Sequence, residues 1–462
     1  MSSFCLVGHI FSMDLVKSVL PTYINAFECL RISMGEGIIV RSDYNDFDAQ
    51  FYHDRVQTCA YLMLPDDDRI RLHHAIGMKS LETMESAEWL SFDIPMSFVE
   101  TDDRQVLFDV VYQLNKAVSL IKENGDTGLL RRLNFEAGCK AQVSYSVDKA
   151  LEYFRIAENL LPEQAWDIDS IREEVFRLKL RIADCMRIVD DNANALLYAT
   201  EALSHAKDQL EKSSVVVLCI QILHNGGKYT EAYEIANRFI SDFMETIPLD
   251  ATVEDANEAV REAATQLGRI SIENIKRLLF SKDPYHIAIM NVLNVAATTA
   301  FFKSDAIFGL YTAAMVKRSL THGLVPSSLV GFGYLAMYYS TLANNSESTF
   351  LIAETAYELS GTLDNLSRAK VLMAYALCSA ERTCTPAPEF KELMQEAFEL
   401  ATRAHDPMVA GIAGTIRSLI INCQPSYHYE CTNFFSACYR ISNVMYARTG
   451  VPTFSSKART SI

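Results

Sequence analysis

The chain has 462 residues, of which 49% are hydrophobic and 22% are charged. These values exclude a disordered chain and allow two to four domains or one long repeat array. The formal net charge of −16 disfavours binding to a nucleic-acid backbone or to an anionic membrane, because both attract clustered Lys and Arg.

Three features of the sequence indicate a cytoplasmic protein. Unbroken apolar stretches are short, as at Val215–Ile220, whereas a membrane-spanning helix needs about 20 apolar residues. The first residues, MSSFCLVGHIFSM, carry no basic region ahead of the apolar ones, unlike a signal peptide. The eleven cysteines are scattered and odd in number, which favours reduced thiols. We therefore expect no membrane partner.

Residues 1–75 predict a small winged-helix-like unit, in which helices accompany a two-stranded hairpin. A winged helix by itself suggests DNA binding, but residues 1–80 hold seven Lys/Arg against ten Asp/Glu. That balance has the wrong sign for DNA, so we expect no nucleic-acid partner. The expected elements are a helix at 11–20 with Ser12 as N-cap, a helix at 23–34, strands at 37–42 and 48–53, and a helix that ends at Pro65.

From Asp66 onward the pattern is helical almost to the end of the chain. A helix opens with the acidic residues Asp66, Asp67 and Asp68, which suit the positive end of a helix dipole. A loop broken by Pro95 is expected at 87–104. The next helix, 103–121, has Val106, Val110, Leu114 and Val118 on one face.

Small residues in Leu133–Pro162 recur where two helices would touch. Gly138 precedes Ala150 by twelve residues, and Ala150, Phe154 and Ala157 share one helical face. Pro162 cannot continue the helix before it. This spacing is typical of a tetratricopeptide-type helical hairpin, which needs neighbouring hairpins to bury its apolar face.

The same spacing recurs twice further along the chain. Ala183 precedes Ala195 by twelve residues, and Ala199 and Ala202 follow; a third copy has Ala232, Ala236 and Phe239 on its second helix. Further helices are expected from 285 to 447, with small residues at Ala296, Gly331, Gly333, Ala336, Gly411 and Gly414 that allow close packing. The sequence thus predicts an all-α fold, an α-solenoid of TPR-like hairpins after the winged-helix-like unit. The predicted divisions are 1–75, repeats over 76–245, further repeats over 246–448 and a frayed tail at 449–462.

Two stretches carry a likeness to a known family. They are FYHDRVQTCAYLMLP at Phe51–Pro65, followed by RIRLHHAIGMKSL, and FDVVYQLNKAVSLI running into the hairpin at 133–162. Together with the later helices they resemble the region after the nucleotide-binding domain of large signalling ATPases of the STAND branch of AAA-related proteins, whose ATPase module is origin-recognition-like. The resemblance implies a sensory arm and covers nearly the whole chain.

The chain has no G-x-x-x-x-G-K-[ST] segment with which to bind phosphates. We therefore expect no enzyme activity and no cofactor in this chain; ATP is expected only with an ATPase module missing upstream of residue 1. A truncated gene model is favoured over a stand-alone remnant.

The resemblance makes His53 a candidate sensor of nucleotide phosphate in a full-length protein, with Arg55 as its charge partner. An imidazole donates to phosphate oxygens and, when protonated, adds charge. The residues themselves favour a simpler interpretation, in which Asp54 caps the helix and His53 packs beside it.

Other candidate residues favour structural roles. His73 and His74 are adjacent on a helix and point apart, so they suit surface or partly buried positions better than a metal site. Cys378 with Cys384, and Cys431 with Cys438, are spaced for helix cores rather than for zinc. We expect no metal. The clusters Asp66–Asp68 and Asp190–Asp191 start helices or fill turns, and the Tyr-rich segments 334–339 and 427–439 favour core positions over a ligand groove.

Two functions remain open. The first is a non-catalytic sensory region of a STAND-type signalling ATPase, whose helical array binds a protein partner or ligand and controls an upstream nucleotide-binding module. The second is a stand-alone adaptor that presents a concave face to a peptide.

Overall fold

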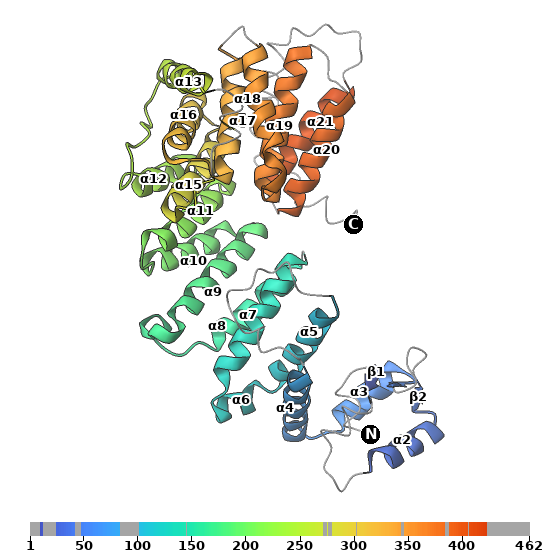
Figure 1. Cartoon of the computed structure of the whole chain (residues 1–462). Helices are drawn as coiled ribbons and strands as arrows, with labels where there is room; N and C mark the ends of the chain where they lie inside the picture. Colours follow the sequence, from blue (N-terminus) through green and yellow to red (C-terminus); the bar gives the residue numbers. More distant parts are fainter. Residues whose placement is uncertain are drawn as a thin grey trace. The chain divides into compact units, whose positions relative to one another are not determined.

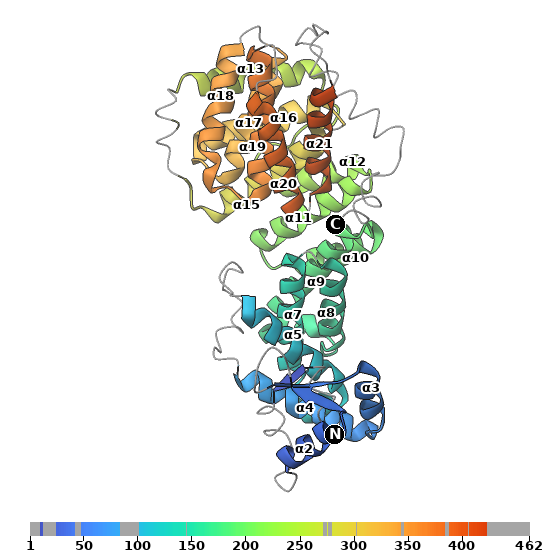
Figure 2. The same ribbon diagram turned by 90° about the vertical axis from the view of Figure 1, so that its right-hand side faces the viewer.

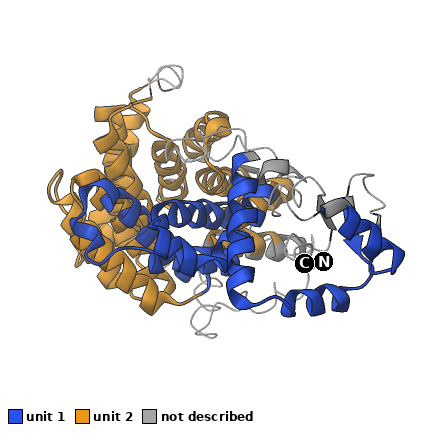
Figure 3. Ribbon diagram, turned by 90° about the horizontal axis from the view of Figure 1, so that it is seen from below, with its two compact units in different colours: residues 1–189 blue, residues 190–462 orange. Residues whose placement is uncertain are grey.

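The computed structural model describes residues 10–12, 25–41, 48–83, 101–144, 146–270, 275, 280–301, 303–342, 346–383, 388–404 and 406–422. These residues form two compact units, 1–189 and 190–462 (Figure 3). Helices make up most of the described chain and strands very little of it (Figure 1). The fold is therefore helical, as predicted.

The N-terminal part of the first unit holds a small antiparallel sheet. Its strands are β1 (Ile10–Ser12), β2 (Ile39–Arg41) and β3 (Asp48–Phe51), in the order β1-β3-β2. The predicted hairpin of β2 and β3 is confirmed, with Val40 opposite Gln50. The predicted helix at 11–20 is wrong at its start, because Phe11 and Ser12 pair with β3; most of that segment lies outside the described residues.

Three helices adjoin the strands of this sheet along the chain and help to bury its apolar face. They are α2 (Ala26–Gly35), α3 (Asp54–Leu62) and α4 (Asp66–Thr83). Ile39, Ala49 and Phe51 are buried with Ala60 and Ile76 in one cluster. Strand residues that alternate between faces, and helix residues three or four apart, bring these side chains together.

The rest of the first unit is helical. The predicted helix at 103–121 is two helices, α5 and α6, separated at Ala117, and α5 already begins at Thr101. Val110 and Leu114 are buried as predicted, whereas Val106 is exposed. The elements are α5 (Thr101–Lys116), α6 (Val118–Asn124), α7 (Thr127–Val143), α8 (Val147–Asn159), the short 3-10 helix η4 (Ala165–Asp167) and α9 (Asp169–Ile188).

Close helix packing in the first unit depends on Gly138. A β-carbon at this position would lie 2.5 Å from Cε1 of Phe154, a distance that side chains do not tolerate. Phe154 is fully buried on α8 together with Ala150 and Ala157. The predicted contact face of this hairpin is therefore confirmed.

The second unit consists of a series of helices. The elements are α10 (Asn192–Ser204), α11 (Gln209–Asn225), α12 (Tyr229–Ile240), α13 (Val253–Gly268), α15 (Pro284–Phe301), α16 (Asp305–His322), α17 (Pro326–Ser340), α18 (Ser346–Glu358), η5 (Ser360–Thr362), α19 (Asn365–Thr383), α20 (Pro388–Arg403) and α21 (Pro407–Asn422). The helix predicted at 427–447 lies outside the described residues.

Most of these helices pack in two layers, whereas α10 packs on α11 and α13 packs on α16 and α17. In the first layer α11, α15, α17, α19 and α21 contact one another in succession. In the second layer α12, α16, α18 and α20 each contact two successive helices of the first (Figure 2). One continuous cluster of buried apolar residues runs from Val216 to Ile416 between the layers.

Small residues lie at the helix interfaces of the second unit. A β-carbon on Gly331 would lie 3.0 Å from Cβ of Met315, and one on Gly333 would lie 2.9 Å from Cβ of Ala374. Ala195 and Ala232 are fully buried. Gly411 is an exception to the prediction, since a β-carbon there would meet no atom within 4 Å.

None of the helices built from described residues combines the length and the hydrophobicity needed to span a bilayer.

Candidate functional site

His53 is the N-cap of α3, a role that the sequence suggested for Asp54. Its Nδ1 accepts a hydrogen bond from the backbone N–H of Arg55 at 3.1 Å, and its backbone is extended. Asp54 is instead the first helical residue. The side chains of His53 and Arg55 are both exposed. Their role toward a nucleotide stays a prediction.

His73 is more deeply buried than the sequence suggested, with 2% of its surface exposed. One ring nitrogen lies 2.6 Å from Oε1 of Gln113 and the other lies 3.2 Å from the hydroxyl of Tyr61. Burial lowers the pKa of His73, and the hydrogen bond from the imidazole to Gln113 opposes this shift. His73 is therefore a satisfied core histidine, and its neighbour His74 is half-buried.

The other predicted candidates occupy structural positions. Asp66–Asp68 form the first turn of α4. Asp191 caps α10 by accepting from the N–H of Asn194, and Asp190 adopts a left-handed turn conformation. Cys378 is buried, whereas Cys384, Cys431 and Cys438 lie outside the described residues. Among the residues that the structure does describe, no three His, Cys, Asp or Glu side chains gather as metal ligands.

One strong ion pair is buried in the first unit. Nε and Nη2 of Arg131 on α7 donate to the two carboxylate oxygens of Glu174 on α9, at 2.6 and 3.0 Å. The two side chains are only 6% and 7% exposed. A bidentate pair compensates both charges and fixes the relative position of the two helices.

A buried polar cluster in the second unit is the best candidate site. It consists of Asn294 and Thr298 on α15, Tyr334 on α17 and Lys370 on α19, and we call it the Lys370 cluster. Nζ of Lys370 donates to Oδ1 of Asn294 at 3.2 Å and to Oγ1 of Thr298 at 2.9 Å. The hydroxyl of Tyr334 lies 3.0 Å from the same threonine oxygen.

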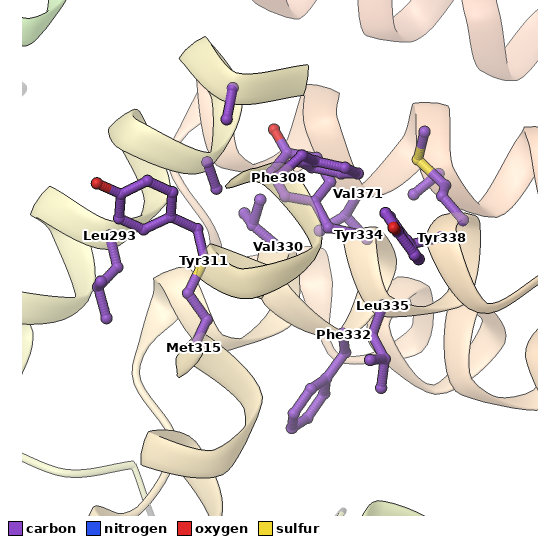
Figure 4. Packing of buried hydrophobic residues seen from close by; sticks show 14 of the residues in the cluster. Leu293, Phe308, Tyr311, Met315, Val330, Phe332, Tyr334, Leu335, Tyr338 and Val371 are labelled. Carbon is purple, nitrogen blue, oxygen red and sulfur yellow. The ribbon is translucent and has the colours of Figure 1, made fainter. Parts of the chain in front are cut away.

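The members of the Lys370 cluster reach solvent only slightly. Their exposed fractions lie between 4% and 7%, whereas their apolar neighbours Leu335, Ala336 and Leu372 have none. Figure 4 shows Tyr334 beside Phe308 and Val371, and the two aromatic rings meet edge to face with centroids 5.3 Å apart. The cluster therefore combines polar side-chain ends with apolar surroundings.

The electrostatics of this region involve helices on either side of the cluster. Burial lowers the pKa of Lys370, and Asp406 and then Asp364 partly oppose the shift. Burial also lowers the pKa of His224, near the end of α11, to about 4; Asp406 opposes this shift and Lys370 adds to it. Charges on α11, α19 and just before α21 are thus coupled, and helix interiors with strongly shifted groups are candidate functional sites.

Both acidic residues near Lys370 serve as helix caps. Asp364 accepts from the N–H groups of Leu366 and Ser367 at the start of α19. Asp406 accepts from the N–H of Val409 at the start of α21. The charges of both acids therefore shift the pKa of Lys370, although neither acid forms an ion pair with it.

No sequence pattern predicted a role for Lys370, Asn294 or Thr298. The tyrosines of Tyr334–Tyr339 were predicted to lie in the core, and Tyr334 is indeed buried. A usable signal was present, because Asn294 and Thr298 are four residues apart and therefore on one face of a mostly apolar helix.

The chain was compared with known proteins. No protein-family profile matches it. It is 31% identical over 136 residues to hybrid signal transduction histidine kinase G of Dictyostelium discoideum, a match that covers 29% of this chain and 4% of that protein. Its structure resembles that of a STAND protein with a tetratricopeptide repeat sensor from Pyrococcus horikoshii, with 11% identity and a TM-score of 0.35. That likeness covers 99% of this chain and 64% of the other, so the chain spans less than two thirds of either protein.

Proposed function

We propose that this chain is the non-catalytic sensory region of a cytoplasmic STAND-type signalling protein. In this proposal the helices form an α-solenoid of TPR-like hairpins that binds a partner or ligand. Binding then changes the state of a nucleotide-binding module elsewhere in the protein. This requires the partner or ligand to bind one arrangement of the helices better than another.

The observation that carries the proposal is the Lys370 cluster. Its side chains come from three successive helices of one layer, α15, α17 and α19. The hydrogen bonds of the cluster hold these three helices at one spacing, so a partner that favours another spacing has to break them. Stacked helical hairpins present extended surfaces on which such a partner can dock.

Two further observations support the proposal. The β2–β3 hairpin after α2, together with the strand order β1-β3-β2, suits a winged-helix-like unit. The locally similar Dictyostelium protein is named as a signal transduction kinase, which supports a signalling context. Within the second unit, a docked protein or peptide is a suitable partner.

The proposal is tested on the transcript and on the protein. Sequencing the transcript upstream of the first codon should reveal an in-frame G-x-x-x-x-G-K-[ST] segment, whose backbone amides cradle phosphate. An upstream stop codon without such a segment would contradict the signalling-ATPase proposal and favour the stand-alone adaptor.

A second measurement addresses catalysis. Calorimetric titration of the 462-residue chain with Mg-ATP should show no binding heat, and a coupled phosphate-release assay should show no turnover. Saturable ATP binding with turnover would contradict the non-catalytic part of the proposal. An ATP analogue that lacks a hydrolysable bond separates binding from turnover in the same experiment.

A further inference from the structure

His286 in the first turn of α15 contacts the turn at 323–325 that joins α16 to α17. Its ring is fully buried, and its Nε2 lies 3.0 Å from the backbone oxygen of Gly323. A carbonyl oxygen can only accept, so Nε2 carries the proton and donates it. Next to this contact, Ser281 donates its backbone N–H to the oxygen of Leu324 at 2.7 Å. A side chain and a backbone group therefore hold the turn against the start of α15.

The other ring nitrogen of His286 makes this contact sensitive to protonation. When Nε2 carries the single proton of a neutral imidazole, Nδ1 holds a lone pair. Nδ1 is buried and has no hydrogen-bond partner among the described residues. A proton added at Nδ1 would create a buried cation with one N–H that no group accepts, which is costly. The closed contact therefore requires a neutral imidazole.

An exposed histidine lies beside the buried one. The rings of His286 and His322 stack with their centroids 5.4 Å apart and their planes inclined by 28°. His322 is the last residue of α16 and is exposed to solvent. A proton taken up by His322 therefore places a positive charge next to the buried ring, and two imidazolium rings at this distance repel each other.

The charges around His286 favour its neutral form. Burial lowers the pKa of His286; the hydrogen bond to Gly323 opposes this shift, Arg318 and His322 add to it, and Asp283 opposes it. Among the described residues of the helices that pack on α15, which are α11, α12, α16 and α17, only α16 contributes a charge that acts on this ring. The direction of the pKa shift therefore agrees with the buried, unpartnered Nδ1.

We infer that His286 and His322 form a proton-sensitive contact, which holds the turn at 323–325 against the start of α15 and releases it when His286 takes up a proton. On release, the protonated ring reaches water, and the hydrogen bonds to Gly323 and Leu324 are lost. Because α16 and α17 belong to different layers, a change at their turn alters how the layers are joined. This inference goes beyond the proposed sensory function and does not depend on it.

The sign of the pH dependence follows from proton binding. The closed contact binds a proton at His286 less readily than the open one, because the pKa of His286 lies below its ordinary value of 6.5. The open form therefore gains as the pH falls below 6.5, by up to about tenfold per pH unit for one proton. Above that value the contact should not respond to pH.

The test follows hydrogen exchange at the Ser281 amide in the full chain, from about pH 8 to about pH 5, the range in which histidine changes charge. After correction for the intrinsic pH dependence of amide exchange, this amide should exchange faster below pH 6.5, by up to about tenfold per pH unit. His286→Gln retains an N–H donor for the Gly323 oxygen but has no group that titrates in this range. Exchange in this variant should stay slow at every pH.

A second variant tests the neighbouring ring. His322→Gln removes the adjacent charge and should move the faster exchange to lower pH without abolishing it, so an unchanged pH profile would contradict the role of His322. The matched control is His205→Gln at an exposed position on α10, which should behave as the wild type does. If His286→Gln fails to fold, wild type and His322→Gln still decide the question.

Three results would overturn the inference. Corrected exchange at Ser281 in the wild type could be independent of pH, or His286→Gln could show the same pH dependence as the wild type. Alternatively, Ser281 and the amides at the centre of α19 could exchange at the same corrected rate at low pH, which would indicate global unfolding instead of local release. None of these results affects the transcript test, so the proposed sensory function is judged separately.

Discussion

Arg131 in the first unit and Lys370 in the second are both buried between helices, but within the described residues only the arginine pairs with a carboxylate. In the first unit Arg131 forms a bidentate pair with Glu174, and both residues are almost fully buried. In the second unit Lys370 is held by an amide, a hydroxyl and no carboxylate within the described residues. The two side chains are about equally buried, at 5% and 4% exposed, so the difference lies in what balances the charge.

The comparison separates structural from functional buried charge. A pair that satisfies itself, such as Arg131–Glu174, holds two helices together and needs nothing from outside. Lys370 has an amide and a hydroxyl as acceptors, so within the described residues no counter-charge offsets the cost of burying its charge. A buried polar side chain in a helical array therefore indicates a function only after its hydrogen-bond and ion-pair partners have been identified.

The largest expected effect is on the compensated pair. Arg131→Met leaves the carboxylate of Glu174 buried without a partner and should destabilise the first unit by about 3–5 kcal/mol. Urea unfolding followed by tryptophan fluorescence measures this directly, since Trp166 lies in the first unit and the sequence has no tryptophan after residue 189.

The double variant Arg131→Met/Glu174→Leu is the control for this measurement. It removes both charges and should recover most of the loss, because apolar residues often replace a buried pair at little cost. A single variant within about 1 kcal/mol of wild type would mean that the pair behaves as an exposed one, and the contrast with Lys370 would fail.

The pH dependence of the second unit should be nearly as large. His224 has a pKa of about 4 in the folded chain, against an ordinary value of 6.5. Between these values the unfolded chain binds the proton and the folded chain does not, so stability falls as the pH drops from 6.5 toward 4. The full loss from this residue is roughly 3 kcal/mol, at about 1.4 kcal/mol per pH unit.

The measurement is a series of urea titrations across that range, followed by circular dichroism. His224→Phe should flatten the pH dependence, whatever its effect on absolute stability, whereas His205→Gln at an exposed position should leave it unchanged. Identical slopes in wild type and His224→Phe would show that the helix layer does not hold this imidazole neutral.

The sequence predicted the packing well because packing leaves a periodic trace. Gly138 and Ala150 are twelve residues apart, as are Ala183 and Ala195, and all four are buried. The strand β1 was missed, because a three-residue strand depends on its pairing with β3 and leaves almost no local pattern. Val106 was misplaced because the buried face of α5 is centred on Leu107, Val110, Val111 and Leu114, and Val106 lies beside that face.

The candidate site was much harder to predict than the fold. Lys370 and Asn294 are 76 residues apart in sequence, so only the stacking of α15, α17 and α19 brings them together. Asp54 and His53 show the same limit on a smaller scale. Both residues could cap α3, and only the backbone geometry assigns the cap to His53.

A smaller loss of stability is expected from disturbing the contact between α7 and α8. This contact depends on side-chain packing and does not involve the Arg131–Glu174 ion pair. Gly138→Ala forces a β-carbon to within 2.5 Å of the buried Phe154 ring and should cost about 1–3 kcal/mol. Gly128→Ala in the same helix meets only Nη2 of Arg131 at 3.9 Å, so it should be neutral or stabilising by up to about 1 kcal/mol. The tryptophan-detected urea titration measures both, and equal stability of the two variants would contradict the close approach at Gly138.

The smallest expected loss of stability concerns the exposed imidazole of His53, which unlike Lys370 is in contact with solvent. His53→Ala removes the acceptor for the Arg55 N–H and should cost about 0.5–1 kcal/mol, because solvent replaces the lost cap in part. Hydrogen exchange at the Arg55 amide should become faster in this variant and stay slow in His53→Asn, since an asparagine side chain also caps helices. Unchanged exchange in His53→Ala would show that the imidazole does not protect this amide, and it would leave His53 free for another role.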